Sequence, residues 1–368
     1  MFSTSQHNLR RAVVAALAVT SLALSGCSSW DTGNAEQESS NSEIISELEN
    51  SSDKPDPRQL KGVSTVSAFD EVEPVAENPE PALPVELTDN DGNAVKVEDV
   101  SRIVALDMYG TYTKTLRGLG LSENIVGRTN SSNEESLKDL PVVTQGGHDI
   151  NVEAVLSLRP SLIIVDHSIG PRGAIDQLRE SGIPTVVMSP DRSLEKMEEG
   201  IKNLAGVVGL QEEGDKLAQR SLDEYEEAVQ AIREIAPEKP LKMAFLYARG
   251  DGGVFYVLGK EDSTDDLISG LGGTDVATEQ GIGAPSPANA EALAKLNPEV
   301  FVMMSEGLES TGNLQGLLAR PGVANTTAGK NQRILALPDG DSLAFGPQTG
   351  EMLLRAAQAL YLKDGQSQ

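Results

Sequence analysis

The apolar positions of this chain alternate between short uninterrupted runs and longer stretches in which apolar residues recur at helical spacing. Runs such as Ile103–Leu106 and Leu162–Val165 are typical of buried strands, and stretches such as Arg172–Glu180 are typical of amphipathic helices. We expect further strands at residues 125–127, 184–188, 241–248, 254–258, 300–304 and 334–337, and further helices at residues 111–119, 152–158, 194–208, 264–271, 314–319 and 351–362. This alternation predicts an α/β fold with mostly parallel sheets.

One sequence pattern occurs twice. Residues 151–164 read NVEAVLSLRPSLII, and residues 289–302 read NAEALAKLNPEVFV. Each copy has an Asn suited to cap a helix, a short amphipathic helix, a Pro that ends it, and a buried strand. A second pair of apolar strands, at residues 102–106 and 242–246, keeps nearly the same separation. The chain is therefore expected to form two Rossmann-like lobes of one design, with a ligand cleft between them.

The two lobes are separated in the sequence by a helical stretch. Residues 212–235 form a long polar-rich pattern that Pro237 stops, and a helix of roughly 22 residues spans about 33 Å. We interpret it as a rigid spine that limits the lobes to small hinge movements. The expected lobes are residues 85–190 and 238–368, with linking helices at residues 191–237.

The N-terminus has the pattern of a secretory signal. A pair of arginines, an apolar stretch and the sequence LSGC lead to Cys27, the single cysteine of the chain. We expect residues 1–26 to be a lipoprotein signal peptide and Cys27 to carry a lipid anchor at the extracytoplasmic face of the cell membrane. An ordinary signal peptide with an incidental cysteine is the alternative.

Composition separates the region after Cys27 from the rest of the chain. Residues 28–84 are rich in Ser, Asn, Glu and Pro, and such a segment buries too little apolar surface to fold. We therefore expect residues 27–84 to be a disordered acidic tether. The formal net charge of −26 also disfavours nucleic acid as a partner.

Histidine is scarce, which makes each one a candidate ligand. The chain has 3 histidines, of which His7 lies in the signal. His148 belongs to the sequence GGHDI just before the first copy of the repeat, and His167 follows a predicted strand. Both are expected at the edges of the cleft, where open α/β sheets bind ligands beyond the carboxyl ends of their strands. An ordinary surface or hydrogen-bonded histidine is the alternative for each.

Tyrosines at strand ends supply a second kind of ligand. Tyr247 and Arg249 are two residues apart in a predicted strand, so their side chains share one face. A cation beside a phenol favours the anionic phenolate, a hard ligand that suits Fe(III). Tyr109 and Tyr256 are competing candidates, and a half-buried tyrosine beside an incidental arginine is the alternative to a site.

The sequence has none of the catalytic motifs that would indicate an enzyme. Patterns such as G-x-S-x-G, H-E-x-x-H and C-x-x-C do not occur. Two histidines in the mature chain are also few for a dedicated zinc or manganese site. We expect a binding protein and not an enzyme.

Several of these features together resemble the solute-binding lipoproteins of ATP-driven importers for iron complexes and cobalamin. The resemblance covers about residues 93–362 and rests on RIVAL at 102–106, on the two repeats, and on ARPGV at 319–323 followed by RILALP at 333–338. It implies a class III periplasmic-binding-protein fold, a monomer, and delivery to a permease with its ATPase. Family members dock through one Glu per lobe, and Glu153 and Glu291 hold matching positions in the repeats. Favourable placement of a Glu at a helix N-terminus, with no partner, is the alternative.

Within that family, the sequences GGHDIN at 146–151 and YARG at 247–250 resemble the haemin-binding lipoproteins of haem importers. This resemblance implies haem as the transported ligand, His148 and Tyr247 as the two axial iron ligands, and Arg249 as the partner of the tyrosine. Arg172 is a candidate for binding a haem propionate. A ferric siderophore or cobalamin is the alternative ligand, and an envelope enzyme or a structural lipoprotein is the alternative class.

Overall fold

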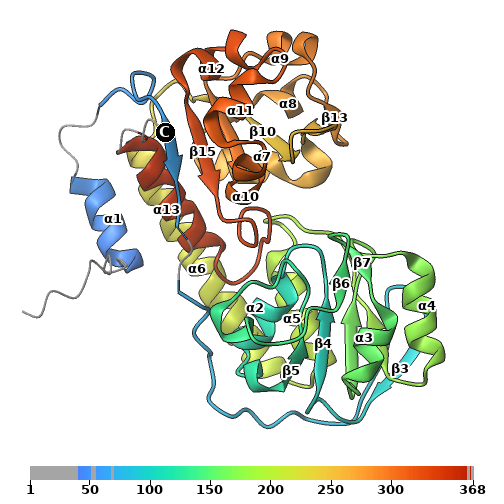
Figure 1. Cartoon of the computed structure of the whole chain (residues 1–368). Helices are drawn as coiled ribbons and strands as arrows, with labels where there is room; N and C mark the ends of the chain where they lie inside the picture. Colours follow the sequence, from blue (N-terminus) through green and yellow to red (C-terminus); the bar gives the residue numbers. More distant parts are fainter. Residues whose placement is uncertain (1–39, 51–54, 68–69, 363–364, 366–368) are drawn as a thin grey trace, which may run out of the picture. The chain divides into compact units, whose positions relative to one another are not determined.

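The computed structural model describes residues 40–50, 55–67, 70–362 and 365, and residues 39–368 form one compact unit. The expected signal peptide and Cys27 lie outside the described residues. Within the described residues, two α/β lobes are joined by one long helix (Figure 1). No helix of the described part is long and apolar enough to cross a membrane.

The N-terminal lobe is built on a parallel sheet. Its strand order is β5-β4-β8-β9. The strands are β4 (Ile103–Leu106), β5 (Ile125–Gly127), β8 (Leu162–Val165) and β9 (Thr185–Val187), and the helices are α2 (Thr111–Gly118), α3 (Val152–Ser157), α4 (Arg172–Glu180) and α5 (Met197–Val207). Two hairpins absent from the sequence prediction complete the lobe, β2 (Val85–Thr88) with β3 (Ala94–Val97) and β6 (Thr144–Gln145) with β7 (Asp149–Ile150).

The C-terminal lobe has a larger mixed sheet. Its order is β1-β15-β14-β10-β11-β13, with β12 beside β10. The strands are β1 (Val63–Thr65), β10 (Lys242–Arg249), β11 (Val254–Val257), β12 (Thr274–Asp275), β13 (Ser286–Pro287), β14 (Val300–Met304) and β15 (Ile334–Leu337). The helices are α7 (Thr264–Gly270), α8 (Val276–Glu279), α9 (Ala290–Leu296), α10 (Ser305–Ser310), α11 (Asn313–Ala319), α12 (Thr327–Asn331) and α13 (Thr349–Tyr361).

The internal repeat predicted from the sequence is confirmed by strand pairing and helix capping. Strand β4 pairs with β8 in parallel, and β10 pairs with β14 in the same way. The side chain of Asn151 accepts a hydrogen bond from the Ala154 amide, and Asn289 accepts one from Ala292. Both caps satisfy a free N–H of the first helical turn, so the repeated helix begins in the same way in both lobes.

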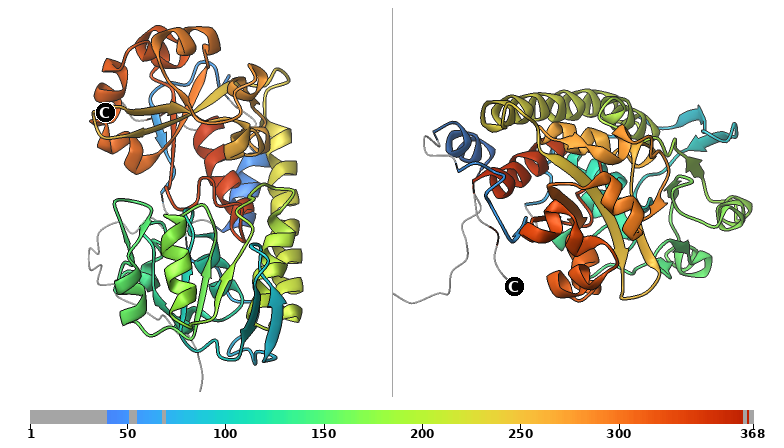
Figure 2. Two further views of the ribbon diagram at one scale, coloured as in Figure 1. Left: turned by 90° about the vertical axis from the view of Figure 1, so that its right-hand side faces the viewer. Right: turned by 90° about the horizontal axis from the view of Figure 1, so that it is seen from above.

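Helix α6 (Gln211–Ile235) is the spine expected from the sequence, with 25 residues. It runs along both lobes in the side view of Figure 2. Leu217 and Ala218 pack into the hydrophobic core of the N-terminal lobe, and Ala231 and Ile232 pack into a core of the C-terminal lobe. Because both ends of α6 are buried in different cores, the helix fixes the relation between the lobes.

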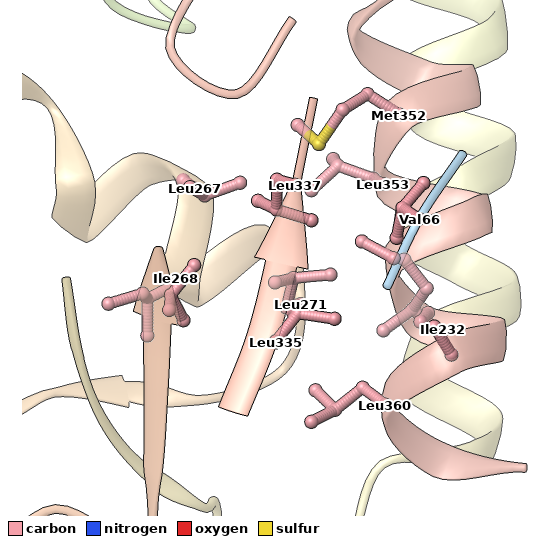
Figure 3. Close-up of a cluster of buried hydrophobic side chains, with 14 of the residues drawn as sticks. Val66, Ile232, Leu267, Ile268, Leu271, Leu335, Leu337, Met352, Leu353 and Leu360 are labelled. Carbon is pink, nitrogen blue, oxygen red and sulfur yellow. The ribbon is translucent and has the colours of Figure 1, made fainter. Parts of the chain in front are cut away.

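The core of the C-terminal lobe around α6 also contains α13 and one face of the sheet. We call it the spine core (Figure 3). Its central side chains are Val66, Ile232, Leu267, Ile268, Leu271, Leu335, Leu337, Met352, Leu353 and Leu360. All of them are at most 5% exposed. This core joins strand, spine and C-terminal helix in one packed layer.

The expectation that residues 27–84 form a disordered tether is wrong for part of that range. Helix α1 (Asn41–Asn50) buries Ile44 and Leu48 in the spine core, against α6 and α13. Strand β1 pairs in parallel with β15, so the N-terminal segment supplies an edge strand of the C-terminal sheet. The few apolar side chains of this segment are buried by partners that lie far away in the sequence.

The position of α5 also differs from the expected linker at residues 191–237. Met197, Ile201 and Leu204 are buried in the core of the N-terminal lobe, together with Leu116 of α2. Helix α5 therefore belongs to that lobe. Helix α6 follows α5 and leads from that lobe to the C-terminal lobe.

The docking of α1 can be tested through Leu48. Replacing Leu48 with Ala should lower the free energy of unfolding by about 2–4 kcal/mol, because a fully buried side chain would leave a cavity. Urea unfolding of residues 28–368 measures the change. Glu49→Ala, on the exposed side of the same helix, is the control. Equal stability of the two variants would mean that α1 does not pack on the spine.

Candidate functional site

Strand β10 carries Tyr247 and Arg249 on one face, as the sequence predicts. Phe245 on the same face lies in the spine core, and Tyr247 packs against that core, whereas Ala248 faces the core on the other side of the sheet. The Arg249 Cζ atom stands 5.0 Å from the centre of the Tyr247 ring. The guanidinium therefore lies over the phenol face, in the geometry of a cation–π contact.

The position of Arg249 is set by a residue that the sequence prediction missed. One of its terminal nitrogens donates to Asp339 Oδ2 over 2.6 Å, and the same nitrogen is 3.5 Å from the sulfur of Met304. Asp339 follows β15, and Met304 ends β14. Three neighbouring parallel strands thus bring these groups to one edge of the sheet.

His148 reaches the boundary between the lobes on the turn that connects β6 and β7. Gly146 and Gly147 have φ angles of 58° and 96° in this turn, a backbone region that favours glycine. The loop before α4 holds the turn, since the Gly170 amide donates to the His148 carbonyl over 3.1 Å. The Ile150 amide in turn donates to the Gly170 carbonyl over 2.6 Å.

The surroundings of His148 favour a neutral imidazole. Burial and the charge of Arg249 both lower the pKa of His148 from its usual 6.5, against a smaller opposite effect of Asp149. Arg249 belongs to the other lobe, so its charge acts on His148 across the boundary between the lobes. Its Nδ1 atom is buried and has no hydrogen-bond partner among the described residues, which is uncommon for a structural histidine.

His167 has a different environment. Its Nε2 atom lies 2.8 Å from Asp91 Oδ1, and Asp91 also accepts a hydrogen bond from Arg179. The His167 ring is thus held in a polar cluster within the N-terminal lobe. Arg172 lies at the edge of this cluster, 3.9 Å from Asp91, with 71% of its side chain exposed. The two histidines differ in their surroundings: in the described part, only His148 of the pair has a buried ring nitrogen without a hydrogen-bond partner.

The other candidate tyrosines lie near Tyr247. Tyr256 is directly opposite Tyr247 in the antiparallel pairing of β11 with β10, so the two side chains share a face. Tyr109 comes from the N-terminal lobe and packs, like Tyr247 and Tyr256, against the spine core. Arg192 stands 4.6 Å from the centre of the Tyr109 ring. Aromatic side chains from both lobes therefore approach one region.

Next to Tyr109 lies a buried cluster of charged side chains that was not predicted from the sequence. Arg192 donates to Asp166 over 2.5 Å and to Asp107 over 3.3 Å, and the Tyr112 hydroxyl donates to Asp166 over 2.7 Å. Burial raises the pKa of Asp107 to about 6, against the lowering effect of Arg192. Both aspartates directly follow strands of a parallel sheet, and this position is the sequence feature from which the cluster could have been predicted. The cluster fixes the strand ends that face the other lobe.

Polar contacts also connect the lobes directly. Lys114 on α2 forms an ion pair of 3.0 Å with Asp341, and both side chains are almost buried. The Thr111 hydroxyl donates to the Ala344 carbonyl over 2.7 Å. These contacts hold α2 against the chain segment that follows β15.

Glu153 and Glu291 occupy equivalent places on the two lobes. Each is the second residue of its repeated helix, after the capping Asn, and each is exposed. Carboxylates are favoured at this end of a helix by the helix dipole. The lobes thus present a matching pair of negative charges.

The arrangement suits a flat ligand with a metal at its centre. An imidazole and a phenol come from opposite lobes, and the aromatic side chains nearby offer apolar surface. Among the described residues, no group of three or more His, Cys, Asp and Glu is placed to hold a metal ion by itself. Histidine and tyrosine are both known as axial ligands of haem iron.

Known proteins resemble this chain over most of its length. Residues 103–340 match the family model described as periplasmic binding protein. The chain is 23% identical over 283 residues to YvrC of Bacillus subtilis (strain 168), an ABC transporter substrate-binding lipoprotein. That match covers 76% of this chain and 86% of YvrC.

Solved structures agree with the family. The haem-binding protein HmuT is 62% identical, with a TM-score of 0.83, and the match covers 84% of this chain and all of HmuT. The periplasmic haem-binding protein RhuT from Roseiflexus sp. RS-1 is 32% identical, with a TM-score of 0.66 over 71% of this chain and all of RhuT.

HmuT has also been solved as three alanine variants, of one histidine, one tyrosine and one arginine. Those residues have the same separations along HmuT as His148, Tyr247 and Arg249 have along this chain. The family match, the paired lobes and the spine helix agree with the class III fold expected from the sequence. The chain therefore belongs to the periplasmic binding protein family.

Proposed function

We propose that this protein binds haem between its lobes and delivers it to the permease of an ABC transporter. The observation that supports the proposal is that His148 and Tyr247 belong to different lobes and that Arg249 acts on both of them. Arg249 links them, since its guanidinium lies over the Tyr247 ring and its charge lowers the pKa of His148. The same three residue types, at the same separations, were chosen for variants of the haem-binding protein HmuT.

The residues have complementary tasks in this proposal. His148 binds the iron as a neutral imidazole from one side, and Tyr247 binds it as a phenolate from the other. Arg249 supplies positive charge beside the phenolate. With both axial positions filled, no position is open for oxygen, which suits a carrier that must release its ligand unchanged.

The rest of the haem needs apolar contacts and a cation for its carboxylates. Tyr109 and Tyr256 pack against the spine core beside Tyr247 and offer ring faces to the porphyrin. Arg172 is the proposed propionate partner, because its side chain is largely exposed and its loop is bonded to the His148 turn. His167 remains with Asp91 and has no direct part.

Glu153 and Glu291 are proposed to dock the protein on its permease. A matching pair of exposed carboxylates, one on each lobe, suits basic sockets on a transporter that has two similar halves. Lipidation of Cys27 would keep the protein at the extracytoplasmic face of the membrane. The protein is proposed to act there as a monomer. Capture of haem and its delivery then take place near the permease and its ATPase.

The haem site can be tested by titrating residues 28–368 with ferric haemin and following the Soret band. Wild type should show a saturable one-to-one shift. His148→Ala and Tyr247→Ala should each weaken binding at least about tenfold, since even residues that only support metal ligands contribute about 10- to 100-fold. The two variants should have different spectra, and His167→Ala is the matched control. A shift that ignores both substitutions would refute the site, and no saturable shift would favour a siderophore or cobalamin.

Acid should weaken binding through His148. A proton on the imidazole blocks the iron, so affinity falls as pH drops below the His148 pKa, by about tenfold per pH unit. Tyr247 must also lose its proton to bind iron, so acid opposes binding through both ligands. Because burial and Arg249 hold the His148 pKa below 6.5, the part of the loss that comes from His148 should begin below pH 6.5 and steepen the fall there. Arg249→Ala removes one of the two causes and should move the onset to higher pH. Haemin affinity measured from pH 4 to 8 tests this, and an onset unaffected by Arg249→Ala contradicts it.

Docking can be separated from binding. Replacing Glu153 and Glu291 together with Arg should abolish haem uptake by cells that carry the permease, while haemin affinity stays as in wild type. Glu180→Arg with Glu279→Arg makes the same charge change at exposed positions of both lobes and is the control. Uptake that survives the first pair, or is lost equally in both, argues against these docking residues.

A further inference from the structure

We propose that Asp339 is a positioning residue for the haem site, because it fixes Arg249 over the ring of Tyr247. This inference rests on the proposed haem function. The Asp339 carboxylate would not touch haem and would act only through the Arg249 guanidinium.

The first contact is between Arg249 and Asp339. Arg249 is the last residue of β10 and carries a long side chain with several rotatable bonds, 35% of which is exposed. Such a side chain has no fixed position unless a partner holds it. The bond of 2.6 Å from its terminal nitrogen to Asp339 Oδ2 is charge-assisted and short, and it supplies that partner.

Asp339 is itself fixed at its second oxygen. The Glu306 amide, in the first turn of α10, donates to Asp339 Oδ1 over 2.9 Å. The side chain of Asp339 is 13% exposed. Both carboxylate oxygens are therefore occupied, one by the backbone of a helix and one by Arg249, so the carboxylate cannot rotate freely.

The backbone around Asp339 is held on both sides. The amides of Asp341 and Ser342 donate to the Pro338 carbonyl over 3.2 and 3.1 Å, which closes a turn. Asp341 then pairs with Lys114 of the N-terminal lobe. The turn thus presents Asp339 to Arg249 in one lobe and Asp341 to Lys114 in the other.

Two consequences follow for Tyr247. The guanidinium is kept over the ring, where its charge can act on the phenolate. Its charge is also partly offset by Asp339, which limits how strongly it withdraws electron density from the oxygen that binds iron. Asp339 therefore sets both the position of the Arg249 guanidinium and how strongly its charge acts on the Tyr247 oxygen.

A double-mutant cycle in haemin affinity tests the proposal, with residues 28–368, which contain the whole compact unit. Asp339→Ala should weaken binding about tenfold, a value typical of residues that support metal ligands. In an Arg249→Ala background the same substitution should have almost no further effect, since the residue through which it acts is gone. Asp251→Ala, an exposed aspartate in the turn after Arg249, is the control and should bind as wild type.

Spectroscopy separates positioning from a general structural role. The tyrosinate-to-iron charge-transfer band of Asp339→Ala should move toward that of Arg249→Ala. Asp339→Asn should lose less affinity than Asp339→Ala, because the single amide oxygen can still accept from the guanidinium, although the amide NH2 group then faces the Glu306 amide. This variant keeps the side-chain size and carries the test alone if the alanine variant does not fold.

The outcomes are distinct. Wild-type affinity and spectrum in both Asp339 variants would overturn the positioning role, and so would a loss of equal size with and without Arg249. If wild type itself binds no haemin, the proposed function fails. If wild type binds haemin and the Asp339 variants bind it equally well, only the positioning role fails.

Discussion

The arrangement of this protein depends on the burial of one helix in two hydrophobic cores. Leu217 and Ala218 of α6 belong to the core of the N-terminal lobe, and Ala231 and Ile232 belong to the spine core. A helix of 25 residues is about 37 Å long and stiff, so the lobes cannot move far without exposing apolar surface. This constraint limits how far His148 and Tyr247, which belong to different lobes, can move relative to each other.

Polar contacts between the lobes also restrict their relative position, in addition to the burial of α6. The ion pair between Lys114 and Asp341 is almost buried, and a buried pair contributes more to the choice of one arrangement than to the free energy of folding. The cluster of Asp107, Asp166 and Arg192 lies at the strand ends of the N-terminal lobe. The two proposed haem ligands, a neutral imidazole and a phenolate, therefore come from lobes that both carry fixed charges near their boundary.

Sequence and structure agree most closely where a segment forms by its own pattern. Strand β8, helix α4 and strand β14 begin and end as the periodicity predicts, because their apolar residues fill a face of the element itself. The N-terminal segment shows the opposite case. Ile44 and Leu48 are too few to predict a folded helix, and they are buried only because α6 and α13 provide a surface for them.

The sequence by itself determined the α/β class, the paired lobes and the candidate residues, since periodicity, repeat and residue chemistry are local properties of the chain. Residue chemistry alone did not rank His148 above His167, and only the resemblance favoured His148; the structure adds that Asp91, remote in sequence, holds the His167 ring. Nor could the sequence find Asp339, which meets Arg249 only where β15, β14 and β10 end together. Contacts between distant segments were decided by the tertiary structure, because packing and strand order, and not local pattern, set which side chains meet.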